Sequence, residues 1–323
     1  MTGPAPAADS TSSLPLPPRP LRVVILNWNA AADTIAALRQ FAPFTRIAPT
    51  LIMVDNASAS GEAAAIRTAC PQAQVIANPL NQGFSGGSNR GIEAALTANH
   101  AAGIDAPILL LNNDALVNEA ALLALLCVLD EEQDVGVVGP LIYSTGVPAR
   151  LQSAGSRNVV LHIHNQLLTP PASRRPVAYI SGSVALLRAA LLEEIGLLDE
   201  RYFFNVEVAD LCRRAAAAGY RTVVEPAAVV HHNTARSGAL RSTLYTYYLI
   251  RNRFLFIRTH YRLARWPLAL AWAVYGAALT ARLRLGGSAD AATAVWLGTV
   301  DGVSGRFGGQ NERILAACTG VGA

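Results

Sequence analysis

The chain carries three similar segments in one stretch: Val23–Leu26 followed by Asn27-Trp28-Asn29, Leu51–Val54 followed by Asp55-Asn56-Ala57-Ser58, and Ile108–Leu111 followed by Asn112-Asn113-Asp114. A strand buried in a parallel sheet is a continuous apolar run, because helices cover both faces of the sheet. Ligands of such sheets bind beyond the carboxyl ends of the strands. We therefore expect the three polar clusters to meet at one site that suits a sugar, a nucleotide and a hard metal ion.

Apolar runs and helical patterns alternate beyond this stretch as well. We expect strands near residues 22–26, 51–54, 74–77, 107–111, 135–143, 221–225 and 228–232, and helices near 33–41, 61–69, 119–129 and 206–218. A Gly-rich turn at 82–88 opens a further helix through His100, and residues 179–187 are an apolar run. This alternation predicts an α/β fold with a mostly parallel, Rossmann-like sheet and helices on both faces. Residues 144–177 are less regular, and we expect them to form an excursion over the site.

Composition divides the 323 residues into three parts. Residues 1–20 hold six prolines and few large apolar side chains, which predicts a disordered leader and not a secretory signal. Residues 21–240 contain the alternating pattern and form the expected main domain, and residues 241–323 form a helical extension. The four cysteines, Cys70, Cys127, Cys212 and Cys318, lack CxxC spacing, so we expect reduced thiols and a cytoplasmic location.

The C-terminal extension is basic and aromatic. All 26 basic residues of the chain are Arg, and nine of them lie between Pro226 and Ala289, where Asp and Glu are absent from the sequence. Such a segment suits an anionic membrane or nucleic acid. Trp266–Ala281 favours the membrane, because its 16 uncharged residues fall short of a bilayer span and are bounded by Arg. We expect an interfacial helix, with a buried core helix as the alternative, and no nucleic-acid partner.

Three further features are candidates for the chemistry. Asn81–Gly91 is a Gly-rich turn between a strand and a helix, where backbone N–H groups suit a phosphate, or where the turn simply allows tight packing. It lacks the Walker and dinucleotide-binding spacings. Asp114 is placed to bind a hard cation or to cap the next helix. Only one of His231 and His232 can face the site, because neighbouring side chains on a strand alternate.

Other short motifs occur in order along the chain: Ser181-Gly182-Ser183, Gly196–Glu200 with Phe203-Phe204, Asp210–Arg214, Ala218-Gly219-Tyr220, Val229–His232, Arg251-Asn252-Arg253 and Gly305–Gly308. Together with the clusters above, this ordered set resembles a family 2 glycosyltransferase of the GT-A fold, in its rhamnosyltransferase-like branch. The resemblance runs from about Val23 to about Arg258. Each motif is weak alone, and their order makes the set specific.

The resemblance implies inverting transfer of a sugar from a nucleoside-diphosphate sugar to a hydroxyl of a glycan or lipid-linked acceptor, in cell-surface polysaccharide synthesis at the inner face of the plasma membrane. Residues 21–240 would form the nucleotide-sugar-binding and catalytic domain. Asp114 and His231 would hold Mg²⁺ or Mn²⁺, which neutralises the leaving diphosphate. The implied substrate-binding residues are Leu26, Asn27, Asn29, Asp55, Asn56, Asn81, Gly83, Phe84, Asn89, Asn113, Ser181 and Gly182.

One position departs from the family pattern. A carboxylate normally takes the acceptor proton, and in the resembling family it is the Asp of a Glu-Asp pair, whereas this chain has Glu207-Val208. Glu207 is one candidate for the catalytic base, because its side chain is one methylene longer than Asp. Asp210 is the other, because it lies three residues on and shares a helix face. Ser60 replaces a frequent Asp as well, with less consequence.

Three hypotheses follow for the function. The first is an active, metal-dependent, membrane-peripheral glycosyltransferase. The second is a catalytically weakened relative that binds nucleotide sugar or scaffolds a glycan-assembly complex, as Val208 would allow. The third is a nucleotidyltransferase, which would carry a basic, Gly-rich triphosphate loop near the first strand, where this chain has Asn27-Trp28-Asn29-Ala30.

Overall fold

The computed structural model describes residues 17–233 and 239–319. In this part of the chain a ten-stranded sheet has the order β3-β2-β1-β4-β9-β6-β10-β5, with β7 beside β6 and β8 beside β10. Strands β1 to β4, β6 and β10 run in one direction, and the others pair antiparallel to them. The strands are β1 Arg19–Asn27, β2 Ile47–Asp55, β3 Gln74–Ala77, β4 Ile108–Asn112, β5 Ala115–Leu116, β6 Val135–Ser144, β7 Leu151–Ser153, β8 Arg175–Pro176, β9 Val184–Leu187 and β10 Arg221–His232.

Helices cover both faces of this sheet, as the alternating pattern predicted. Helices α1, α2 and α4 pack against one face with Val23 and Ile25, and α3, α5 and α6 pack against the other with Val24. The bounds are α1 Ala31–Arg39, α2 Glu62–Ala69, α3 Gly83–Ala102, α4 Glu119–Glu131, α5 Ala189–Ile195 and α6 Glu207–Ala217, with a 3-10 turn η1 at Glu200–Tyr202. The mostly parallel α/β fold is therefore confirmed.

Strand β1 begins earlier than its apolar run suggested, and two expected strands are joined into one. β1 begins at Arg19 and includes Pro20, so the end of the expected leader 1–20 belongs to the sheet, while residues 1–16 lie outside the described residues. Proline tolerates this place because β4 pairs with β1 only from Arg22 onward, so the missing N–H of Pro20 costs no bond on that side. The two short strands expected at 221–232 form one strand, β10, with a register shift between Glu225 and Val229.

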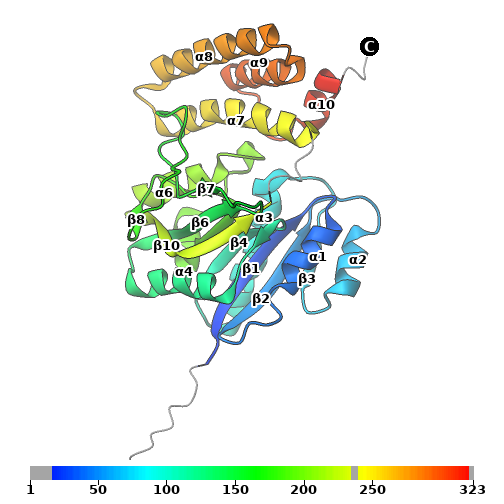
Figure 1. Cartoon of the computed structure of the whole chain (residues 1–323), viewed down its shortest axis with the longest axis vertical. Helices are drawn as coiled ribbons and strands as arrows, with labels where there is room; N and C mark the ends of the chain where they lie inside the picture. Colours follow the sequence, from blue (N-terminus) through cyan, green and yellow to red (C-terminus); the bar gives the residue numbers. More distant parts are fainter. Residues whose placement is uncertain (1–16, 234–238, 320–323) are drawn as a thin grey trace, which may run out of the picture.

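Four helices follow the sheet: α7 Ala239–His260, α8 Arg265–Leu285, α9 Ala289–Ser304 and α10 Asn311–Thr319. Figure 1 shows them as a separate layer, in which α7 lies next to the sheet domain and α8 and α9 lie beyond it. Small residues bring α9 close to its neighbours, because a Cβ on Gly298 would meet the backbone of Tyr247 and one on Gly302 would meet Phe254. By length and composition, α8 is one helix of the described residues that is long and apolar enough to cross a membrane.

Candidate active site

The carboxyl edge of the sheet brings the predicted polar clusters together. Asn27 and Asp55 lie side by side at the ends of β1 and β2, and Asn112 at the end of β4 pairs with Leu26. A chain of side-chain hydrogen bonds then links them: Asn113 Nδ2 donates to Thr34 Oγ1 (3.0 Å), Thr34 donates to Asn27 Oδ1 (2.7 Å), and Asn27 Nδ2 donates to Asp55 Oδ1 (2.9 Å). The segments that end in Asp55 and Asp114 therefore belong to one connected polar network.

Three of the predicted binding residues use their amides to build this edge. Asn27 is fully buried, and besides Asp55 its Nδ2 reaches Ser58 Oγ (3.0 Å) and Glu62 Oε2 (2.9 Å). Asn56 Nδ2 donates to Asn81 Oδ1 (2.9 Å), and Asn89 exchanges bonds with the backbone of Leu198. These three amides are hydrogen-bonded inside the protein and thereby shape the site. Asn29 is exposed and Asn81 is half-buried at its rim.

The Gly-rich turn is formed around Asn56 and opens α3 at the same edge. Asn56 Oδ1 accepts from Gln82 N (3.1 Å), and Asn81 Oδ1 accepts from Gly83 N (2.8 Å). Gly83 has φ +70°, and a Cβ there would lie 2.2 Å from Phe203 O, so a side chain is excluded on both grounds. The first turn of α3 is thus pressed against the loop that precedes α6.

Asp114 meets a histidine, but it is the second one of the pair. β5 pairs antiparallel with the end of β10, which sets His232 opposite Ala115. His232 Nε2 then lies 2.9 Å from Asp114 Oδ1 and 3.4 Å from Asn112 Nδ2. His231 is exposed on the opposite side of the strand, near the ring of Tyr143. Alternation along β10 therefore turns His232, and not the expected His231, toward Asp114.

The donor set at Asp114 and His232 fits a partial metal site. A carboxylate oxygen is a suitable ligand for Mn²⁺ or Mg²⁺, and an imidazole nitrogen favours a transition-metal ion such as Mn²⁺ over the harder Mg²⁺. In nucleotide enzymes such cations complete their shells with substrate phosphates and water. Among the described residues, His, Cys, Asp and Glu form no group of three or more that is close enough to hold a metal. The pair alone leaves most coordination positions free, which suits a cation that arrives with a diphosphate.

Glu207 is a buried carboxyl without a partner for one of its oxygens. Its side chain is within the first turn of α6, and Oε2 is buried with no hydrogen-bond partner in the described residues. The Glu207 carboxyl and the Phe84 ring both lie next to Gly182. A Cβ added to Gly182 would be 3.7 Å from Glu207 Oε1 and 3.9 Å from Phe84 Cε1. Burial raises the pKa of Glu207 to about 7, its own backbone N–H opposes this shift, and the charge of Asp210 adds to it.

Asp210 has the opposite character, so its expected role as an alternative base does not fit the structure. Its carboxylate is 1% exposed and accepts from His260 Nε2 (2.7 Å), Arg214 Nε (2.9 Å) and the hydroxyl of Tyr202 (3.3 Å). Burial by itself would raise the pKa of Asp210, but the bonds from His260 and Arg214 outweigh it and hold the pKa below its usual value. Asp210 therefore joins α6 to the end of α7 as an ionised, fully engaged group.

The loop before α6 owes its shape to residues that sequence reasoning missed. Phe203, Asn205 and Val206 have φ values of 63°, 74° and 74°, a left-handed conformation that is costly for residues other than Gly. Asn252 of α7 holds this loop, because its Nδ2 lies 3.0 Å from Tyr202 O, 2.8 Å from Phe204 O and 2.7 Å from Asn205 O. The motif Arg251-Asn252-Arg253 signalled importance, but sequence could not show that it contacts residues about fifty positions away.

Arg251 completes this contact as a fully buried cation. Its NH2 group donates to Tyr202 O (2.8 Å), its NH1 group donates to Gly308 O, and its guanidinium stacks over Tyr248 at 4.6 Å from the ring centre. The Gly305–Gly308 motif is thereby tied to the same loop. We call Arg251, Asn252 and the backbone of residues 202–205 the α7 clasp.

Asn252→Ala is expected to lower the free energy of unfolding by about 2–4 kcal/mol, because the backbone oxygens of the clasp lose a buried donor. Urea unfolding measures this. Gln133→Ala is the control, since that exposed amide bonds the nearby Asp130 O and its loss should cost below about 0.5 kcal/mol. Wild-type stability in the Asn252 variant would show that the clasp does not hold the loop.

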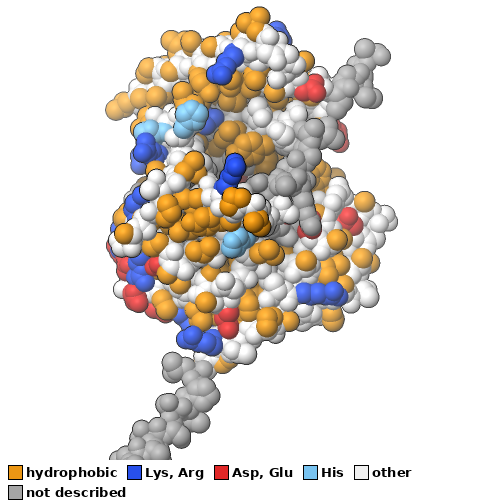
Figure 2. Space-filling view, viewed as in Figure 1, with side chains coloured by type: hydrophobic (Ala, Val, Ile, Leu, Met, Phe, Trp, Pro, Cys, Tyr) orange, Lys and Arg blue, Asp and Glu red, His pale blue; other side chains and the backbone are white. Residues whose placement is uncertain are grey.

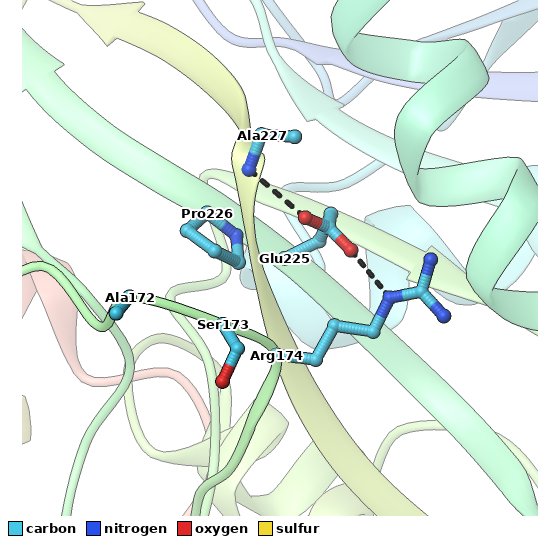
Figure 3. Close-up of a pocket in the computed structure, with 6 residues that line it drawn as sticks. All are labelled: Ala172, Ser173, Arg174, Glu225, Pro226 and Ala227. Carbon is cyan, nitrogen blue, oxygen red and sulfur yellow. Dashed lines mark hydrogen bonds and ion pairs between the residues drawn. The ribbon is translucent and has the colours of Figure 1, made fainter.

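A cavity of about 630 Å³ on the surface lies away from this edge, and Figure 3 shows its lining. It is lined by Ala172, Ser173, Arg174, Glu225, Pro226 and Ala227. Its two charged residues engage each other, since Arg174 Nε lies 2.5 Å from Glu225 Oε2, and Glu225 Oε1 accepts from Ala227 N (2.9 Å). These pairings join β8 to the irregular part of β10, and we assign the cavity a structural origin.

A family model described as glycosyltransferase like family 2 matches residues 17–247. The chain belongs to this glycosyltransferase family. Its relatives include the N-acetylglucosaminyl-diphospho-decaprenol L-rhamnosyltransferase of Mycobacterium tuberculosis, which is 27% identical over 237 residues, 67% of this chain and 77% of the relative. The low-salt glycan biosynthesis hexosyltransferase Agl10 of Haloferax volcanii is 26% identical over 247 residues, 73% of this chain and 74% of the relative. The predicted rhamnosyltransferase-like family is confirmed.

Two solved structures share the fold of this glycosyltransferase. The mannosyltransferase PcManGT from Pyrobaculum calidifontis, in complex with GDP-Man and Mn²⁺, has a TM-score of 0.54 at 16% identity over 88% of this chain and 87% of that one. GalNAc-T7 with UDP, GalNAc and Mn²⁺ has a TM-score of 0.52 at 13% identity, and the match covers 73% of this chain and 51% of GalNAc-T7. The chain thus spans about half of GalNAc-T7.

As a family 2 glycosyltransferase, the protein has an apolar residue where a base was expected. Val208 is 4% exposed and packs in the core between the sheet, α3, α5 and α6. Val208 also lies next to Gly182, because a Cβ added to Gly182 would be 3.2 Å from Val208 Cγ2, as it would be 3.7 Å from Glu207 Oε1. The two neighbours therefore lie at the same part of the site, and one of them carries a carboxyl.

Proposed function

We propose that this glycosyltransferase moves a sugar, with inversion, from a nucleoside-diphosphate sugar to a hydroxyl of a lipid-linked acceptor, at the cytoplasmic face of a membrane, and that Glu207 is the base. The observation that carries the proposal is the buried carboxyl of Glu207, whose Oε2 has no hydrogen-bond partner among the described residues and whose pKa is raised to about 7. This carboxyl lies beside Gly182, and the next residue, Ser183, accepts a backbone bond from Asn112 at the end of β4. Family membership supports the reaction class, and the two contrasting carboxyl groups of α6 support the choice of Glu207 over Asp210.

Asp114 and His232 are the proposed ligands of a divalent cation, Mn²⁺ or Mg²⁺. Such a cation supplies positive charge against the diphosphate as it leaves. Mn²⁺ is present in both solved structures of this fold described above. Asn112 and the polar network behind it hold Asp114 and His232 at the end of β4 and β10.

The nucleotide-sugar pocket is proposed to lie along the carboxyl ends of β1 and β2 and the start of α3. Asp55 is buried and accepts from Asn27 through one oxygen, while its second oxygen has a single long contact with Ser58 N (3.4 Å). That second oxygen suits a donor of the base or ribose. Backbone groups around Gly83 and the ring of Phe84 would border the sugar. The further proposed pocket residues are Leu26, Asn29, Asn81, Asn113, Ser181 and Gly182.

In the proposed reaction, the acceptor hydroxyl attacks the sugar and Glu207 takes up its proton. The acceptor oxygen forms a bond to the anomeric carbon, the bond from that carbon to the diphosphate breaks, and the acceptor proton passes to the Glu207 carboxylate. Two more buried polar atoms without partners in the described residues, Ser85 Oγ and Asn205 Nδ2, belong to the start of α3 and to the loop before α6. We propose that they bind sugar hydroxyls.

The acceptor class rests on the relatives. The mycobacterial relative is named for a diphospho-decaprenol acceptor, and Agl10 is named for glycan biosynthesis. A polyprenyl-diphosphate sugar is therefore the acceptor that we propose for this chain. Such an acceptor is anchored in a bilayer, which would require the enzyme to work at a membrane surface.

Thermal unfolding with a panel of UDP, GDP and dTDP, each with and without Mn²⁺, tests the proposed donor class. A nucleotide that binds only the folded protein should stabilise it by about 2.7 kcal/mol at a hundred times its Kd. We expect one nucleotide to raise Tm, with a larger shift when Mn²⁺ is present. Unchanged Tm with every nucleotide and metal would reject the proposal.

A further inference from the structure

One face of the helical layer exposes a row of large apolar side chains. On α8, Trp266, Leu270 and Val274 are 75%, 66% and 61% exposed. Their spacing of four residues places them on one side of the helix. Trp272 and Gly276 are buried on the inner side of the same helix, where a Cβ on Gly276 would collide with Thr299 of α9. The apolar row is therefore the outer face of a helix that is already packed along its inner face.

A second segment, far away in the sequence, packs against the inner side of α8 and against Tyr261 just after α7. Trp272 Nε1 donates to Val160 O (3.0 Å), and Asn158 Nδ2 donates to the hydroxyl of Tyr261 (2.8 Å), which fixes the loop of residues 157–164 next to α8. Leu161 and Ile163 in this loop are more than half exposed. The fully exposed Leu263 lies in the short connection between α7 and α8. We call these residues, together with Trp266, Leu270 and Val274, the apolar face.

The two segments that supply the apolar face carry formal charges of one sign only. The sequence has no Asp or Glu between residues 135 and 192 or between 226 and 289, the two segments that supply the face. Arg157, Arg262, Arg282 and Arg284 are exposed in these segments, and Arg265 lies over the ring of Trp266. In Figure 2 many hydrophobic side chains are visible on the upper layer, with a few basic ones among them and an acidic group at its right end. Several large, exposed apolar side chains accompanied by basic residues are typical of an interaction surface.

From these observations we propose that the apolar face docks in the plane of an anionic phospholipid membrane, with Trp266 and Leu270 inserted between headgroups and the Arg residues bound to phosphates. The charge complementarity favours this occupant. A second copy of the chain would bring an equally basic face against this one, and like charges oppose that contact. Packing of α8 along α9 favours a helix in the membrane plane over a helix that crosses the bilayer.

The inference deepens the proposed function, because it identifies the surface that brings the enzyme to a bilayer-anchored acceptor. Docking, however, involves residues outside the catalytic edge. The two proposals can therefore fail separately: a protein that binds vesicles and lacks transferase activity contradicts the function, and an active protein that ignores vesicles contradicts the docking.

Flotation with lipid vesicles tests the docking surface in the full chain. We expect binding to vesicles of phosphatidylcholine mixed with phosphatidylglycerol, weaker binding to phosphatidylcholine alone, and release by high salt. Trp266→Ser with Leu270→Ser should weaken binding roughly tenfold or more, as expected when buried apolar side chains are removed. Ile104→Ser, at an exposed apolar residue between α3 and β4, is the matched control and should bind as the wild type does.

Three outcomes would overturn the docking proposal. The first is wild-type protein that stays unbound with both kinds of vesicle. The second is a dimer in sedimentation velocity that the Trp266 and Leu270 substitutions dissociate, which would assign the face to a second copy. The third is membrane-bound protein that resists both high salt and carbonate, which would indicate a bilayer-crossing helix. Unchanged thermal unfolding of the double variant would show that lost binding does not come from misfolding.

Discussion

Glu207→Gln is expected to lower kcat by about 10²–10⁴-fold, because an amide cannot take the proton of the acceptor hydroxyl. The nucleotide Kd should stay the same, since the proposed ligands of the diphosphate lie elsewhere on the edge. The wild-type rate should fall as pH drops below about 7, because the pKa of Glu207 is raised to about 7 by burial and a protonated carboxyl is no base. Rates at saturating donor across a pH series measure both effects.

The same substitution should change stability in the opposite direction from activity. Between the ordinary Glu pKa of 4.5 and the raised pKa of about 7, the folded protein holds a proton on Glu207 that the unfolded chain has released. Stability therefore falls as pH rises through this window, by an amount on the order of 3 kcal/mol. Gln does not ionise, so Glu207→Gln keeps the free energy of unfolding that wild type loses as pH rises. The variant should therefore unfold at a higher temperature than wild type above pH 7 and at a similar temperature near pH 4.5. A less stable and less active variant would instead indicate a structural role for Glu207.

Val208→Asp provides the matched comparison, because it restores a carboxylate at the position expected from the family pattern. Val208 is buried in an apolar cluster, so an Asp there should cost roughly 3–5 kcal/mol as an uncompensated buried charge. We expect lower Tm and no gain in kcat. A steep rise in turnover would mean that the native protein lacks a base and that Glu207 has been assigned wrongly.

Asp114→Asn and His232→Ala should each abolish the Mn²⁺-dependent part of nucleotide binding and lower kcat by at least about 10²-fold, since a bound cation contributes several kcal/mol to the transition state. His231→Ala is the matched control, because it removes an exposed imidazole from the adjacent position of the same strand. Isothermal titration with Mn²⁺ and nucleoside diphosphate separates metal binding from catalysis.

The contrast between the two histidines decides this prediction. If His231→Ala and His232→Ala lose metal binding equally, then the alternation of β10 does not select the ligand. If both variants bind Mn²⁺ as wild type does, then the cation has another site or no role. His232 Nε2 lies 2.9 Å from Asp114 Oδ1, so a shift of the His232 ring signals by NMR on adding Mn²⁺-free Mg²⁺ and nucleotide would report a change at this contact directly.

Sequence predicted well what depends on local pattern. Val23–Leu26, Leu51–Val54 and Ile108–Leu111 are buried strands whose polar ends meet at one edge, because continuous apolar runs and parallel connections leave few other arrangements. Glu207 was one candidate base because it precedes the position where the resembling family has its base and has a longer side chain than Asp, and Asp210 was the other because residues three apart share a helix face. Periodicity cannot show which of two carboxyl groups finds partners elsewhere in the fold.

What sequence missed depends on long-range contacts. His232 faces Asp114 because the two-residue strand β5 pairs with the end of β10, a pairing too short to leave a pattern. Asp210 is excluded as a base by His260, fifty residues away. Asn27 and Asn89 are committed to interior bonds with Glu62 and Leu198, which spacing along the chain does not reveal.

The α7 clasp has a practical consequence for dissecting this enzyme into fragments. The family match ends at residue 247, and Arg251 and Asn252 lie just beyond it. A truncated protein that stops there would keep the nucleotide edge, Asp114, His232 and Glu207 in its sequence, yet the left-handed stretch at 203–206 would have lost its anchor on α7. Such a fragment should still recognise nucleotide while turning over poorly, so the boundary suggested by sequence comparison is a poor place to cut when designing a minimal catalyst.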